Sequence, residues 1–421
     1  MKQRRIFKKV IAIMLAVQLL TGGLNVKADE TYKNNTKTVN SLKTQGSLNV
    51  TTLKLQTGFV EKNKRKFVTV EKAADKVRAK VRNHTSSVTV YFKCKMSSPV
   101  KAYMAFKKEL TKETDNSNEG DYMYWGLASD SPQYTRVKKK EGRINYYYYK
   151  FKIGYKYYIT AKQQKLVDSK VRSIIKSFDF QSNTTDYEKV KTIYEYICAN
   201  VSYATDLSNN KIYTAYSALY KKQAVCQGYA QLLYKMLKEV DIPVRLIPGY
   251  SSGELHGWNI VKLGKYYYNL DATWDAVTYQ KGVGYKFFLK GDNFSNHTRM
   301  KEYKSATFYN KYLMAAKTYG TDNQTMSKKS EISCYKMKKG KILSTKSKKI
   351  KMKSLPSGTT YIVEYSTDKS FKNNHIVNTR NKTIKLNKIS SGRTYYVRYR
   401  GVKSFEGTQV YTKWSNIKTV K

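Results

Sequence analysis

A cysteine stands close to a glycine in the stretch VCQGYAQLLYKML, residues 225–237. The residues that follow predict a helix buried along one side, because large apolar side chains recur at helical spacing: Tyr229, Leu232, Leu233, Met236, Leu237 and Val240. Cys226 would lie at the N-terminus of this helix, where unpaired N–H groups and the positive end of the helix dipole favour a thiolate. Gly228 would let the backbone turn tightly. Cys226 is therefore either a candidate nucleophile or a buried capping residue.

Two further candidates lie in the segment LHGWNIVKLGKYYYNLDATWD, residues 255–275. Its pattern predicts two antiparallel strands joined by a two-residue turn at Leu263 and Gly264. In that register His256 faces Asp271 on the same side of the sheet. Directly opposite residues of an antiparallel pair have Cβ atoms about 4.5–5.5 Å apart. We therefore expect the Asp271 carboxylate to accept a hydrogen bond from the His256 imidazole.

These three residue types belong together chemically. A cysteine nucleophile needs a base that generates the thiolate and later protonates the leaving group, and the base needs a partner that holds its tautomer. Cys226, His256 and Asp271 would supply those roles in that order. The remaining histidines lack a neighbouring carboxylate of this kind in the sequence: His84, His297 and His375.

The blocks AVCQGYAQLLYKML, IPVRLIPG, HGWNIV and YYYNLDATWD resemble the core of the transglutaminase-like superfamily, over about residues 185–290. The resemblance implies an α+β fold in which a papain-like helix packs against an antiparallel sheet. It also implies Cys226 as nucleophile, His256 as general base and acid, and Asp271 as the orienting carboxylate. Asp275, in the same run, is the weaker candidate for that last role.

The resemblance further implies that a thiolate attacks an amide bond of a protein or cell-wall peptide and forms a thioester. A primary amine would then give a cross-link, whereas water would give a protease or amidohydrolase, and the sequence leaves this choice open. The backbone N–H of Cys226 would be one oxyanion donor, with Trp258 and Gln227 as nearby candidates for a second. No cofactor or metal is implied. A non-catalytic surface protein that uses the same fold as a binding scaffold is the alternative.

The first 28 residues have the features of a secretory signal peptide. Basic residues precede an apolar run from Val10 to Leu20, and Val26, Lys27 and Ala28 form a small-x-small cleavage pattern. This run is about half the ~20 residues that a membrane-spanning helix needs. We therefore expect a secreted protein whose mature chain has no transmembrane segment.

The sequence is strongly basic, with a formal net charge of +50. Such a field favours polyanions, which for an exported protein would be anionic cell-wall polymers or anionic lipid head groups. Either would hold the protein non-covalently at the cell surface. A solvated basic surface without a partner is the alternative. Nucleic-acid binding is not expected, because the sequence contains no recognisable reading element.

The patterns divide the chain into five parts. We expect a signal peptide over 1–28, a polar linker or weakly ordered region over 29–85, an N-terminal β-rich region over 86–180, a transglutaminase-like catalytic domain over 181–330, and a β-sandwich over 335–421. Within the second part, a helix is predicted over 71–83. A capping box of Thr185 and Glu188 predicts the start of another helix.

The C-terminal part, about residues 340–421, resembles a fibronectin type III domain. Leu386, Gly392 and Tyr395 occupy the positions of that family's leucine, turn glycine and corner tyrosine, while the early strand KIKMKSL lacks the family's tryptophan. Such modules are usually spacers or binding surfaces.

The cysteines argue against a zinc knuckle, because they are far apart and contain no C-x-x-C pair: Cys94, Cys198, Cys226 and Cys334. We expect Cys94 and Cys198 to be packing residues.

Overall fold

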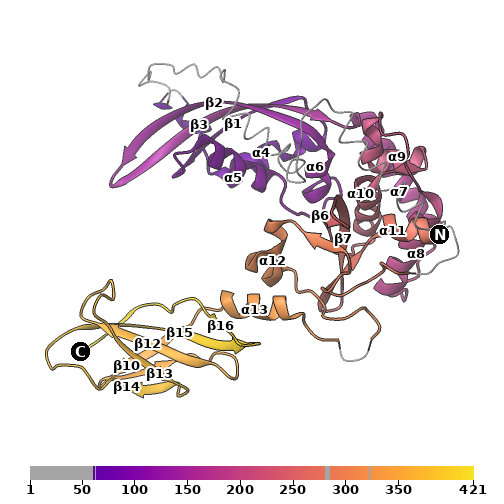
Figure 1. The fold of residues 1–421 in the computed structure, drawn as a ribbon. Coiled ribbons are helices and arrows are strands. Elements are labelled where there is room, and N and C mark those ends of the chain that lie inside the picture. Colours follow the sequence, from indigo (N-terminus) through magenta and orange to yellow (C-terminus); the bar gives the residue numbers. More distant parts are fainter. Residues whose placement is uncertain (1–59, 62, 280–284, 322–323) are drawn as a thin grey trace. The chain divides into compact units, whose positions relative to one another are not determined.

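The computed structural model describes residues 60–61, 63–279, 285–321 and 324–421. The expected signal peptide and residues 29–59 lie outside this part of the chain. Two compact units are present (Figure 1), of which the first comprises the described residues up to Leu263 together with those of 269–289 and 294–299. The second comprises 264–268, 290–293 and 300–421. No helix among the described residues is both long and apolar enough to span a lipid bilayer.

The N-terminal part of the first unit is a three-stranded antiparallel sheet with helices on one face (Figure 1). The strands β1 (Ser87–Cys94), β2 (Leu127–Glu141) and β3 (Ile144–Tyr157) run in the order β1–β3–β2. Alternate residues of β1 are buried, as the period of two predicts. Helices α4 (Val70–Arg82) and α5 (Pro99–Leu110) share one hydrophobic core with this face.

Helix α4 matches the helix predicted over 71–83. It nevertheless lies inside the range that we expected to be a polar linker or weakly ordered. Its apolar face is buried in the core of the sheet through Val70, Ala73, Ala74, Val77 and Val81. The many lysines of this segment lie on the other side, which is how an amphipathic helix covers a sheet. The folded region therefore begins before residue 86.

A group of helices follows the sheet and surrounds a central one, α10 (Cys226–Lys238). The capping box predicted for Thr185 and Glu188 is present at the start of α8. Helix α10 buries ten consecutive residues from Gly228 to Leu237, more than the single stripe that the sequence predicted, because it is packed on several sides. The remaining elements of the first unit that precede β6 in the chain are η1 (Lys64–Lys66), α6 (Gly120–Gly126), α7 (Ala161–Ser177), α8 (Asp186–Asn200), β4 (Ser202–Tyr203), η2 (Asn210–Tyr213), α9 (Ala215–Tyr220) and β5 (Gln223–Ala224).

Helix α10 packs against an antiparallel sheet with the order β8–β7–β6–β9. The strands are β6 (Val244–Ser251), β7 (Glu254–Leu263), β8 (Tyr266–Leu270) and β9 (His297–Arg299), and α11 (Ala272–Tyr279) follows β8. Strand β6 is central, so Gly249 pairs with His256 on one side and with Arg299 on the other. This helix-on-sheet arrangement confirms the predicted α+β fold class.

The turn between β7 and β8 differs by one residue from the prediction. It consists of Gly264 and Lys265, whereas we expected Leu263 and Gly264. Gly264 has a φ of +59°, a conformation that glycine adopts without steric cost, and this places it first in the turn. Asp271 lies just after the end of β8.

The second unit contains a β-sandwich at its C-terminal end. One sheet has the order β10–β11–β14, the other has the order β13–β12–β15–β16, and β17 also pairs with β15. Side chains from both sheets form one core, including Ile350, Val363 and Val397. The elements of this unit are η3 (Lys301–Lys304), α12 (Ala306–Lys311), α13 (Lys328–Met337), β10 (Ile342–Lys346), β11 (Lys349–Met352), β12 (Thr360–Ser366), β13 (His375–Thr379), β14 (Thr383–Lys385), β15 (Tyr395–Phe405), β16 (Thr408–Tyr411) and β17 (Lys418–Val420).

Candidate active site

Cys226 is the first residue of α10, and its thiol is free and partly exposed. No side chain caps this helix end, so its first N–H groups lack side-chain acceptors and carry the positive end of the dipole. Gly228 has a different role from the tight turn we expected. A Cβ added there would lie 2.7 Å from both the Ala224 Cβ and the Ile212 carbonyl oxygen. Glycine is therefore needed for close packing of the segments around the cysteine.

His256 and Asp271 form the predicted pair. His256 Nε2 lies 2.6 Å from Asp271 Oδ2, and both side chains are only 1% exposed. The other carboxylate oxygen, Oδ1, accepts from the backbone N–H of Thr273 at 3.0 Å and of Trp274 at 3.4 Å. His256 Nδ1 is buried and makes no hydrogen bond to any described residue. This leaves Nδ1 as the nitrogen that can exchange a proton with Cys226.

The charges of the three groups support one another. Burial alone would lower the pKa of His256, but Asp271 and the Cys226 thiolate outweigh burial and raise that pKa to about 10. Burial would raise the pKa of Asp271, yet the charges and hydrogen bonds of His256 and His297 hold it well below its usual range. A protonated His256 beside the Asp271 carboxylate is therefore the favoured state at neutral pH.

His297 also belongs to the site, although the sequence analysis assigned it no carboxylate partner. Its Nε2 lies 2.9 Å from Asp271 Oδ2 and its Nδ1 lies 2.8 Å from the Ser295 carbonyl oxygen. Strand β9 brings it there, because His297 pairs with Ser251 of β6. A three-residue strand has no detectable periodicity, and His297 lies 26 residues from Asp271 in the chain. No local signal could have predicted this contact.

Asp275, the weaker candidate for the orienting carboxylate, forms hydrogen bonds with other partners. Its Oδ2 lies 2.7 Å from the Tyr194 hydroxyl and accepts from the backbone N–H of Phe287 at 2.9 Å. Burial raises the pKa of Asp275 to about 6. Since the Tyr194 hydroxyl also lies 2.8 Å from the carbonyl oxygen of Asp271, Asp275 braces the backbone that carries Asp271.

The two side chains considered as second oxyanion donors are both engaged elsewhere. Trp258 Nε1 donates to Asn269 Oδ1 at 3.1 Å, and Gln227 Nε2 donates to the Trp125 carbonyl oxygen at 2.9 Å. The single N–H of Trp258 is therefore committed, whereas the amide group of Gln227 has a second N–H. Tyr203 is near the thiolate, whose charge adds to the effect of burial in raising the pKa of that phenol.

Three side chains of the site are of types that can bind a metal ion. In the described part of the chain, one grouping has ligand atoms within 4.8 Å of one another, formed by His256, Asp271 and His297. Both Nε2 atoms are at hydrogen-bond distance from the same oxygen, Asp271 Oδ2. These contacts are hydrogen-bond contacts, and we assign the three side chains as a hydrogen-bonded network.

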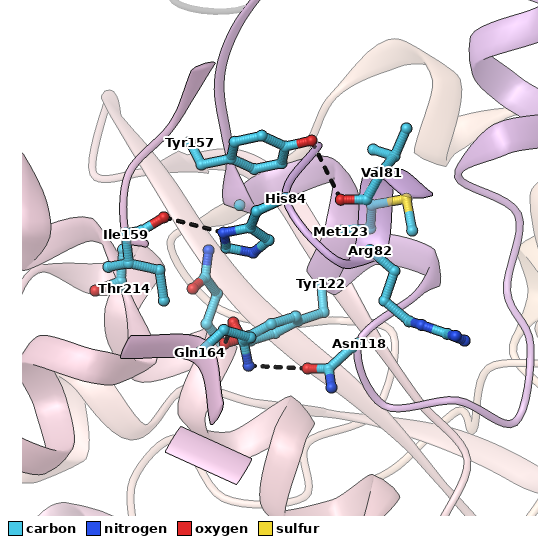
Figure 2. A pocket seen from close by; sticks show the side chains of 12 residues that line it. Val81, Arg82, His84, Asn118, Tyr122, Met123, Tyr157, Ile159, Gln164 and Thr214 are labelled. Atoms are coloured by element: carbon cyan, nitrogen blue, oxygen red, sulfur yellow. Dashed lines mark hydrogen bonds between the residues drawn. The ribbon is translucent and has the colours of Figure 1, made fainter. Parts of the chain in front are cut away.

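A separate small cavity of about 20 Å³ lies between the N-terminal sheet region and the helices, with room for about one water molecule. Figure 2 shows Tyr157 over His84, whose rings stack at 4.3 Å, and Gln164 beside Asn118, bonded at 2.9 Å. The lining includes none of the triad residues. This cavity is therefore distinct from the candidate site.

The segment that carries Cys226, His256 and Asp271 matches a known family. Residues 176–272 match the family model described as the transglutaminase-like superfamily. This part of the chain is transglutaminase-like. The match ends one residue after Asp271, so His297 lies beyond it.

Two curated relatives match part of this chain. Kyphoscoliosis peptidase from Mus musculus is 29% identical over 111 residues, and that from Homo sapiens is 30% identical over 111 residues. Each alignment covers 23% of this chain and 17% of the relative, so the chain spans only a small part of their length. A crystal structure described as a TGase is 14% identical, with 44% of this chain and 51% of that chain covered and a TM-score of 0.25.

Proposed function

We propose that this protein is an exported cysteine enzyme that cleaves or transfers acyl groups at amide bonds of proteins or cell-wall peptides. The proposal rests on one observation above all. A partly exposed thiol starts α10, and the buried His256–Asp271 pair is held at 2.6 Å with His256 Nδ1 uncommitted. The transglutaminase-like domain and the peptidase name of its curated relatives support the same chemistry.

The first half-reaction makes a thioester. The Cys226 thiolate forms a bond to the amide carbonyl carbon, and the carbonyl oxygen takes the negative charge. The backbone N–H of Cys226, at the start of a helix, is a suitable donor to that oxyanion. The carbon–nitrogen bond then breaks as His256 gives the Nδ1 proton to the leaving amine, while Asp271 holds Nε2 and stabilises the imidazolium.

The second half-reaction releases the acyl group. His256, now neutral, accepts a proton from water or from a primary amine as that nucleophile attacks the thioester carbonyl carbon. The carbon–sulfur bond breaks and the thiolate–imidazolium pair is restored. Water gives hydrolysis, which the peptidase name of the relatives favours, and an amine gives a cross-link.

Mass spectrometry of the products tests the proposed reaction. The purified protein, from residue 29 onward, is incubated with an unfolded protein such as casein, with and without a biotinylated primary amine. Peptide cleavage, deamidation and amine incorporation give different mass changes. We expect at least one of them with the wild-type protein and none with Cys226→Ala. Identical product patterns for the two proteins, or no products from either, would overturn the proposal.

We further propose that the protein acts outside the cell and that its β-sandwich is a fibronectin type III-like anchoring module. Support comes from the N-terminal signal pattern and the net charge of +50. In the sandwich, Leu386 is buried and the Tyr395 hydroxyl accepts from the Ser390 backbone N–H at 3.3 Å, a contact like that of a tyrosine corner. Unchanged surface retention after deletion of residues 340–421 would argue against anchoring.

A further inference from the structure

The hydrogen bonds of His297 define its protonation state. Nδ1 faces the Ser295 carbonyl oxygen at 2.8 Å, and Nε2 faces Asp271 Oδ2 at 2.9 Å. Both partners are acceptors, and a neutral imidazole has only one N–H. Only the doubly protonated ring can donate in both directions, so both contacts are hydrogen bonds when His297 is an imidazolium. Its side chain is 0% exposed, so this charge is held inside the protein.

The buried charge changes the electrostatic balance of the site. A Cys226 thiolate and a His256 imidazolium cancel each other, which leaves the charge of Asp271 uncompensated. Buried charges are costly unless an opposite charge lies close by. His297 supplies that charge at hydrogen-bond distance, so the four groups together are neutral.

His297 also restricts the position of Asp271. The carboxylate receives two backbone N–H groups on Oδ1 and two imidazoles on Oδ2. The charged or titratable groups recorded against His297 are Asp271 and His256, the latter with 5.5 Å between ring centroids. Its other ring neighbours in the described part of the chain are uncharged aromatics that leave it little freedom to move: Trp258, Phe287 and Phe294.

We propose that His297 is a positioning residue, an imidazolium that keeps Asp271 ionised and fixed so that Asp271 can hold His256 protonated beside the Cys226 thiolate. The site is then a group of four side chains, Cys226, His256, Asp271 and His297. This inference rests on the proposed function for the roles of Cys226 and His256. It assigns a role to a residue outside the segment matched by the family model.

The test separates charge, hydrogen bonding and packing with two substitutions. His297→Asn keeps a donor for Asp271 without the charge, and His297→Phe keeps an aromatic ring without either. His375→Asn is the control, because His375 lies in β13 of the β-sandwich and its ring packs at an angle against Tyr365. The rate of Cys226 alkylation by iodoacetamide is measured against pH by peptide mass spectrometry, after circular dichroism has established that each variant is folded.

When the His297 charge is removed, Asp271 takes up a proton at a higher pH. A protonated Asp271 no longer stabilises the His256 imidazolium, so the Cys226 thiolate is also lost at a higher pH. We expect His297→Phe to move the acid limb of the alkylation profile up by about one pH unit, or about tenfold in rate on that limb. His297→Asn should move it in the same direction by less, and His375→Asn should not move it. If His297→Phe does not fold, the shift in His297→Asn decides the matter.

Three outcomes would contradict either the role of His297 or the proposed function. Wild-type profiles in the folded His297 variants, with Cys226 still highly reactive, would mean that His297 only fills space. An acid-limb shift produced by treating the wild-type protein with a chelator would mean that the cluster holds a metal, and the charge-balance role would be wrong. If His256→Ala leaves Cys226 alkylation unchanged, the proposed function itself fails, independently of His297.

Discussion

The indole of Trp125 packs directly against Gly257, the residue after His256. A Cβ added to Gly257 would lie 2.8 Å from two carbons of that ring. The carbonyl oxygen of Trp125 also accepts from Gln227, the residue after Cys226. The N-terminal region therefore contacts the residues that follow both the nucleophile and the base, and it forms part of the wall of the candidate site.

This contact predicts that Gly257→Ala destabilises the protein. The added methyl group forces Trp125 to move, and overpacking of this kind costs about 1–3 kcal/mol. Thermal unfolding and the alkylation rate of Cys226 measure the effect. Gly126→Ala is the matched control, since a Cβ there has nothing within 4 Å. Trp125→Ala should relieve the clash, so a double variant as unstable as the sum of the two single variants would contradict this explanation.

Helix α10 also forms a buried ion pair with α7, and Asn118 of the N-terminal region bonds to the same lysine. Lys235 Nζ lies 2.7 Å from Asp168 Oδ1 and 2.7 Å from Asn118 Oδ1, and the lysine side chain is 1% exposed. Lys235→Met leaves Asp168 without its countercharge, so we expect a loss of about 3–5 kcal/mol in the free energy of unfolding. Urea denaturation measures this loss.

Two comparison variants show whether this loss of stability comes from the buried ion pair. Lys165→Met, at an exposed position of α7, should change the stability little. Adding Asp168→Asn to Lys235→Met should recover part of the loss, because the unpaired charge is then gone. Equal effects of Lys165→Met and Lys235→Met would show that the buried pair does not contribute as described.

Asp275 predicts a specific pH dependence of stability. Its pKa in the folded protein is raised to about 6 by burial, so the folded state binds this proton more tightly than the unfolded state does. The resulting stabilisation is complete below about pH 4 and is lost as the pH rises through 6, by on the order of 2–3 kcal/mol. Asp275→Asn keeps an oxygen acceptor for Tyr194 and removes the titration.

The free energy of unfolding should therefore depend less on pH between 4 and 7 in Asp275→Asn than in the wild-type protein. Chemical denaturation at several pH values measures both curves. Asp115→Asn, at an exposed position, provides the control and should follow the wild-type curve. A parallel pair of curves for wild type and Asp275→Asn would contradict the assignment.

Several features of the site could be predicted from local sequence. The helical spacing after Cys226 predicted α10, and the alternating segments around Gly264 predicted the hairpin of β7 and β8. Residues close together on one hairpin have few ways to be arranged, so the pairing of His256 with Asp271 followed even though the turn is shifted by one residue.

Other features depend on contacts between segments that are distant in the sequence. His297 reaches Asp271 because the short strand β9 pairs with β6, and Trp125 reaches Gly257 because α6 packs beside the sheet. Neither contact leaves a periodic pattern or a motif in the chain. Tertiary contacts also give Gly228 and Asp275 roles that the local sequence did not indicate. Gly228 allows close packing, and Asp275 forms a buried hydrogen bond with Tyr194.

The most direct test of the central claim is the alkylation rate of each cysteine in the purified protein across pH, read by peptide mass spectrometry. Cys94 and Cys198 are buried and Cys334 is partly exposed, so they serve as internal controls. We predict that Cys226 alone reacts fast at about pH 6, where ordinary thiols are protonated, and that His256→Ala removes this advantage. A Cys226 that is accessible but reacts no faster than Cys334 would contradict the account.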